Sequence, residues 1–100
     1  MTPSSARIAS IEFEIHIPSA QSLKDKRRVI RSLKDRLRAN FNISVAETDH
    51  QDKWQRATLS IVSVSTDALY LEGLFESIAR FIENEILGSA YIIRQSTEIH

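Results

Sequence analysis

The feature that most constrains the fold is a strict alternation of apolar and polar residues near the N-terminus. In the segment RIASIEFEIHIP, residues 7–18, isoleucine or phenylalanine occupies every odd position from 11 to 17, with Glu12, Glu14 and His16 between them. A period of two predicts a strand with one buried face and one solvent face. Pro18 and Ser19 end this strand.

A helix is predicted next, because Ser22 can cap its start and Asp25 follows as a short capping box. Its apolar stripe consists of Leu23, Val29, Ile30, Leu33, Leu37 and Phe41. Strands are predicted over 41–48 and 54–65, joined by a polar connection at 49–53. Their inward residues are Ile43, Val45, Ala57, Leu59 and Ile61.

A second helix is predicted from about Asp67 to Leu87, capped by Ser65 or Thr66 and stopped by a left-handed Gly88. Its inward stripe is Leu71, Leu74, Phe75, Ile78, Phe81, Ile82 and Ile86. Gly73 inside it costs about 1 kcal/mol relative to alanine, and close packing is one explanation. Residues 90–98 form a last strand.

The resulting order, β-α-β-β-α-β, predicts an α+β ferredoxin-like fold: a four-stranded antiparallel sheet with both helices on one face. One such domain is expected over residues 7–100, after a disordered N-terminal tail at 1–6. The start, MTPSSAR, resembles neither a signal peptide nor a membrane span.

Charge is concentrated in one segment, although the chain carries no net charge. SLKDKRRVIRSLKDRLR, residues 22–38, holds eight basic and two acidic residues, and the remaining chain is correspondingly acidic. A dipolar distribution of this kind bears on partners rather than on fold.

The basic residues of the first helix form a stripe roughly 130° from its apolar stripe, at about 100° per residue. Cations at a helix start oppose the macrodipole, so they suggest a bound anion, and polyphosphates are common anionic partners. The candidate nucleic-acid-binding residues are Lys24, Arg27, Arg28, Arg31, Lys34 and Arg38. Two alternatives stay open: a solvated face kept for solubility, or neutralisation of Arg31 or Arg38 by Glu72 or Glu76. We expect the basic and acidic stripes to face opposite edges.

Lys26 falls inside the apolar stripe, and Glu47 shares the inward parity of Val45. Both belong to the same pole of a β-α-β unit, which predicts a half-buried structural ion pair between them. A catalytic Lys/Glu pair is the less favoured reading, because no third group with a clear role is near in sequence.

Catalytic and metal signatures are missing. The chain has no cysteine, which fits a reducing cytoplasm and excludes a thiol nucleophile. Glu47, Asp49, His50 and Asp52 cluster without a recognised ligand spacing, so we expect no metal and no cofactor. No nucleophile motif surrounds any serine or histidine, and no catalytic residue is assigned. Trp54 is expected to cover one end of the core, with stacking on a base as the alternative.

The predicted open face of the sheet carries Glu12 and Glu14 on one strand and Thr58, Ser60 and Val62 on another. This mixed face lacks aromatic platforms for bases. It suits a symmetric homodimer better than RNA.

Four linked motifs, SLKDKRR, SLKDRLR, FNISVAE and WQRATL, resemble the YlxP-like family of small bacterial proteins. The resemblance covers nearly the whole chain after the tail. It implies a dimeric ferredoxin-like domain without an established activity, often encoded beside translation-initiation and ribosome-maturation genes. No functional residues are established for the family, so none are carried over.

The expected function is a non-enzymatic cytoplasmic binding module, associated with RNA or the ribosome through its basic first helix. The alternative is a homodimeric protein-interaction module that docks an acidic partner, and an enzyme is a distant third.

Overall fold

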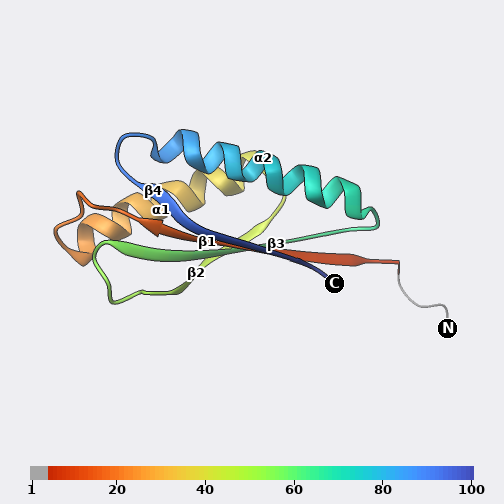
Figure 1. Cartoon of the computed structure of the whole chain (residues 1–100), viewed down its shortest axis with the longest axis horizontal. Coiled ribbons are helices and arrows are strands. Elements are labelled where there is room, and N and C mark those ends of the chain that lie inside the picture. The colour runs from red at the N-terminus through yellow and green to blue at the C-terminus, as the bar shows by residue number, and fades with distance from the viewer. Residues whose placement is uncertain (1–4) are drawn as a thin grey trace.

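Within residues 5–100, which the computed structural model describes, the chain forms a four-stranded antiparallel sheet with two helices on one face (Figure 1). The other face of the sheet is uncovered. The elements are β1 (Arg7–His16), α1 (Leu23–Asn40), β2 (Ser44–Asp49), β3 (Arg56–Ser65), α2 (Ala68–Ile86) and β4 (Tyr91–Ile99). The predicted order of strands and helices is therefore confirmed.

The sheet has the strand order β2-β3-β1-β4. β1 pairs antiparallel with both β3 and β4, and β2 pairs with β3, so β2 and β4 are the edge strands. This is the order of a ferredoxin-like fold, in which each helix crosses over between two parallel, non-adjacent strands. The fold class is as predicted.

The core lies between the sheet and the helices. Phe13 is opposite Leu59 and Ile11 is opposite Ile61, so cross-strand neighbours reach the same inner face. The predicted inward residues of both central strands are buried. Of the predicted helix stripes, the buried members are Ile30, Leu33, Leu37, Leu71, Phe75, Ile78, Ile82 and Ile86, and the partly buried members are Leu23, Val29, Phe41, Leu74 and Phe81.

Several boundaries differ from the prediction by one to three residues, including β3, which was predicted from residue 54 and begins at Arg56, and two of them have clear local reasons. Asp67, rather than Ser65 or Thr66, caps α2, because its carboxylate accepts hydrogen bonds from the backbone N–H groups of both Leu69 and Tyr70. The strand predicted from residue 41 begins at Ser44, because the Phe41 N–H still bonds to a carbonyl of α1.

The predicted tail at residues 1–6 falls mostly on positions 1–4, which lie outside the described residues. Ser5 and Ala6 are exposed and precede β1.

The two glycines have different roles. Gly88 follows α2 with a φ of 87°, so it forms the predicted left-handed helix stop. At Gly73, a Cβ atom would meet nothing within 4 Å. Close packing is therefore not the reason for Gly73, and that explanation was wrong.

We expect Gly73→Ala to raise the free energy of unfolding by about 0.5–1 kcal/mol, because alanine removes backbone entropy from the unfolded chain without a clash in the helix. Urea denaturation followed by circular dichroism measures the change. Gly88→Ala is the matched control and should destabilise, because its positive φ disfavours a Cβ. Equal effects of the two substitutions would contradict the prediction.

Candidate functional site

The start of α1 is set by two side chain–backbone hydrogen bonds. The Ser22 hydroxyl accepts from the Asp25 N–H at 3.1 Å, and Asp25 Oδ2 accepts from the Gln21 N–H at 3.0 Å. Ser22 is therefore the predicted N-cap. These bonds fix the residue at which the helix begins.

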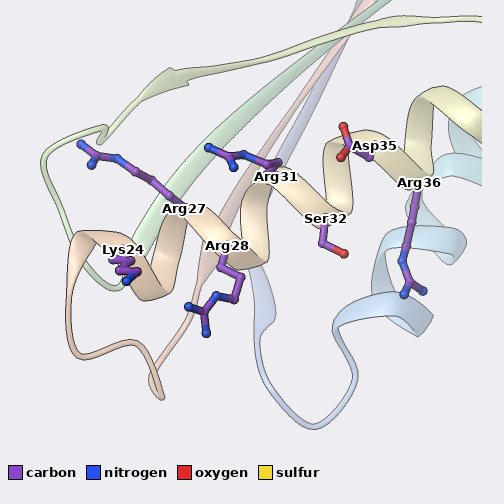
Figure 2. A pocket seen from close by; sticks show the side chains of 7 residues that line it. All are labelled: Lys24, Arg27, Arg28, Arg31, Ser32, Asp35 and Arg36. Atoms are coloured by element: carbon purple, nitrogen blue, oxygen red, sulfur yellow. The ribbon is translucent and has the colours of Figure 1, made fainter.

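Four cationic residues at the start of α1 are exposed and border one hollow of the surface, with a volume of about 790 Å³ (Figure 2). The residues that line it are Lys24, Arg27, Arg28, Arg31, Ser32, Asp35 and Arg36. Arg27 and Arg31 extend to one flank of the helix, and Arg28 extends to the other. Lys24, Arg27, Arg28 and Arg31 are hereafter called the basic surface of α1.

The cations of α1 differ in whether they have partners. Arg36 pairs with Glu85 of α2 at 2.6 Å. Arg38 lies 3.6 Å from Asp35 and donates to the Val45 carbonyl at 3.1 Å. Among residues 5–100, no ion pair or hydrogen bond engages the side chains of the basic surface or of Lys34, which is half-buried.

Neutralisation of the basic stripe by α2 does not occur in the described part of the chain. Neither Arg31 nor Arg38 pairs with Glu72 or Glu76 there. Both glutamates are exposed, as is Glu83 farther along α2. The acidic groups of α2 and the basic groups of α1 therefore remain separate among the described residues, apart from the bridge between Arg36 and Glu85.

Lys26 is the one charged residue of α1 that points into the protein, with 0% of its surface exposed. Its Nζ lies 2.9 Å from Glu47 Oε2 and donates to the carbonyls of His50, Gln51 and Arg56 at 2.7, 3.3 and 3.3 Å. The ammonium group thus has four acceptors for three protons. The structure brings together the two residues that were expected to pair, but buries the lysine fully rather than by half.

The loop after β2 is shaped by this lysine. His50 has a φ of 63°, in the left-handed region that strains non-glycine residues. Its carbonyl accepts from Lys26 and from the Lys53 N–H, and its own N–H donates to Asp49 Oδ1. The hydrogen bonds to the buried ammonium compensate for the strained backbone.

The polar residues of that loop do not converge. Glu47 turns to Lys26, Asp49 binds backbone, and the His50 ring lies 2.9 Å from the Thr58 hydroxyl. Within residues 5–100, no group of three or more acidic or histidine side chains is arranged to hold a metal ion. Glu47, Asp49 and His50 thus each have another partner.

A second polar cluster lies on the open face of the sheet, and sequence reasoning missed it. Glu14 is 12% exposed; it pairs with Arg56, lies 3.8 Å from Arg94 Nε, and is 4.0 Å from His50 Nε2. These side chains border a hollow of about 280 Å³. The alternation of apolar and polar residues places Glu14 and Arg56 on the outward face of the sheet, so the sequence could have indicated these two members of the cluster. The approach of Arg94 depends on a β-bulge after Glu14, which parity cannot reveal.

Trp54 does not cover the core, contrary to the expectation for it. Its side chain is 55% exposed, in the hairpin just before β3. It lines a separate hollow, which no residue of α1 borders. The hairpin is instead anchored by Gln55, whose side chain donates to the carbonyls of Pro18 and Ala20, so Trp54 is not needed to close that end.

Neither helix of the described chain is long and apolar enough to cross a lipid bilayer.

Lys26→Met should lower the free energy of unfolding by about 3–5 kcal/mol, because it leaves a buried carboxylate and three carbonyls without their donor. Chemical denaturation with urea measures the loss. Lys24→Met, at an exposed lysine two residues earlier, is the control and should change stability by about 0.5 kcal/mol or less. Similar losses in both variants would show that the buried ammonium group is not a structural anchor.

Comparison with known proteins gives consistent results. A family model described as "Protein of unknown function (DUF503)" matches residues 8–95. The uncharacterized protein YlxP of Bacillus subtilis (strain 168) is 35% identical over 77 residues, which are 77% of this chain and 84% of that protein.

Solved structures with a similar fold include a dimeric protein of unknown function and ferredoxin-like fold from Bacteroides fragilis NCTC 9343. It has a TM-score of 0.59 and 10% identity, over 97% of this chain and 96% of that one. Another is the Bacillus subtilis YXEP protein, a dinuclear metal binding peptidase from the M20 family, with a TM-score of 0.62 and 14% identity, over 94% of this chain and 26% of that one. At these identities the likeness shows the fold alone.

The family match spans most of the chain, and the relative from Bacillus subtilis shares over a third of the aligned residues. The resemblance to YlxP-like proteins is therefore confirmed, and the chain belongs to the DUF503 family of proteins of unknown function.

Proposed function

We propose that this protein is a non-enzymatic cytoplasmic module that binds RNA, with cationic side chains of α1 contacting the phosphate groups of the RNA. The observation that carries the proposal is the basic surface of α1, where four exposed cations border one hollow without an ion pair among the described residues. Lys34 is a fifth cation of this helix that has no ion pair among the described residues.

The placement of these cations favours a bound anion over a purely structural role. Lys24, Arg27 and Arg28 lie in the first two turns of α1, where the helix dipole is already positive. Each of them is therefore unfavourable in the free protein by a few tenths of a kcal/mol or more. Only Asp25 in this region opposes that charge. An incoming phosphate backbone would relieve the repulsion and release its own counterions.

Arg38 makes a smaller contribution in this proposal than the sequence suggested. Its guanidinium is already bonded to the Val45 carbonyl and lies near Asp35. The gene neighbourhoods implied by the resemblance to YlxP-like proteins make ribosomal RNA the first polyanion to test.

Arg27→Gln/Arg31→Gln should weaken binding to ribosomal RNA by about tenfold or more and reduce the slope of log K against log salt by about two, because two phosphate contacts are lost. Filter binding from 50 to 200 mM salt measures both quantities.

The matched control is Lys53→Gln/Arg80→Gln, which removes the same net charge at exposed positions outside α1. It should leave affinity and salt slope nearly unchanged. Equal losses of affinity in both double variants would show that net charge alone, and not the basic surface, determines binding. A wild-type affinity that does not change with salt would contradict the proposal.

A second candidate function is a homodimeric interaction module. The uncovered face of the sheet carries exposed apolar residues: Ile8, at 51%, lies directly opposite Val64, at 62%, and Val62 is 40% exposed. A second copy that covered this patch would remove apolar surface from water, and a stable interface needs about 800 Å² from each partner. The basic surface of α1 would then dock an acidic protein, and partners recovered from lysate would survive nuclease treatment.

For this candidate, wild type should sediment as a dimer and Val64→Glu as a monomer, because the substitution buries a carboxylate at the interface without a partner. Analytical ultracentrifugation measures the mass. Leu69→Glu, at an exposed apolar residue of α2, is the control and should leave the dimer intact. A monomeric wild type would exclude this mode of association.

A further inference from the structure

The basic surface of α1 has no flat ring on which a base could stack. The hollow is lined only by charged residues and Ser32. The aromatic residue at the end of the helix, Phe41, is partly buried and packs edge-on against Phe81, with ring centroids 5.4 Å apart. Exposed Trp54 lines a different hollow. Proteins that hold single-stranded RNA combine a basic groove with aromatic rings, to which arginine planes add, whereas duplex binders contact phosphates and shape. The basic surface offers arginine planes but no aromatic ring, which favours the duplex.

The cations lie on both flanks of one straight helix rather than in a single line. Arg27 and Arg31 extend to one side and Arg28 to the other (Figure 2). An α-helix with its side chains is about 10–12 Å across. Cations on the two margins of the basic surface, with Arg27 and Arg28 about 100° apart around the helix, can therefore reach two phosphate backbones that border a groove, which a flexible single strand does not offer.

Asp35 lies between the two flanks. At about 100° per residue, its position on the helix falls between Arg28 and Arg31. Its carboxylate is 68% exposed and borders the hollow, and within residues 5–100 its one ion pair, with Arg38, is 3.6 Å long. A carboxylate at this place repels phosphate but accepts hydrogen bonds from hydroxyl groups. The wide minor groove of an RNA duplex presents 2′-hydroxyl groups between its two backbones, and DNA has none.

We infer that the partner of the basic surface is double-helical RNA, with Arg27 and Arg31 toward one backbone, Arg28 toward the other, and Asp35 accepting from a 2′-hydroxyl group between them. This inference rests on the proposed RNA-binding function and specifies its ligand. Recognition is by backbone geometry and sugar rather than by base sequence.

The test compares three probes with the full-length protein: a blunt 20-base-pair RNA duplex, a 20-nucleotide uridine strand, and a DNA duplex of the same sequence as the RNA. Fluorescence anisotropy at one fixed salt concentration gives each dissociation constant. The RNA duplex should bind about tenfold tighter than either other probe, as expected for phosphate contacts on two strands and one hydrogen bond to a charged group.

Asp35→Ala removes both the negative charge and the hydrogen-bond acceptor. It should strengthen binding to the DNA duplex, by removing phosphate repulsion, whereas the RNA duplex also loses the hydrogen bond from its 2′-hydroxyl group, so that the preference for RNA over DNA falls several-fold. An equal gain for both duplexes would overturn the 2′-hydroxyl contact, because Asp35 would then act only by repelling phosphate.

The remaining outcomes distinguish this inference from the proposed function. If the uridine strand binds as tightly as the RNA duplex and both lose affinity in Arg27→Gln/Arg31→Gln, RNA binding stands and duplex recognition is overturned. If no RNA probe binds, or if that double variant binds as well as wild type, both are overturned.

Discussion

The ammonium group of Lys26 joins α1 to β2 and to the hairpin that follows it, 21 to 30 residues later in the sequence. The Lys26 side chain extends from α1 into the core. Its ammonium group binds the Glu47 carboxylate of β2 and carbonyls on both sides of the following hairpin. Burying a charge in this way is costly unless its partners are complete, and here the acceptors exceed the protons. The position of α1 against the sheet, and hence the direction of every other cation on the helix, depends on this set of contacts.

Charge is therefore used in two ways along one helix. Lys26 is satisfied inside the protein, while the basic surface on the outer side is left without partners in the described chain. Arg36, which faces α2, makes the one ion pair between the helices there. α2 keeps exposed Glu72, Glu76 and Glu83 on its own surface. The result is a small domain with no net charge but with a helix of each sign side by side on the sheet.

Much of this arrangement was predictable from local pattern. The alternation around Phe13 and the 3.6-residue spacing of the helices identified the core faces, and the position of Lys26 within the apolar stripe indicated that it points inward. Features that depend on exact register were not predictable. The cluster around Glu14 needs a bulge in the pairing of β1 with β4. The exposure of Trp54 depends on a hairpin that the Gln55 side chain anchors. The alternation of apolar and polar residues in the sequence does not reveal such an anchor.

The position of Arg38 also affects the tendency of the protein to aggregate, independently of any ligand. It places a guanidinium beside β2, an edge strand, and bonds to the carbonyl of Val45. Exposed strand edges are templates on which other chains can add, and cationic side chains are one of the means by which natural sheets resist intermolecular aggregation. β4, the opposite edge, carries Arg94 and Glu98. Each open margin of the sheet thus holds charge that hinders fibril-like growth at high protein concentration.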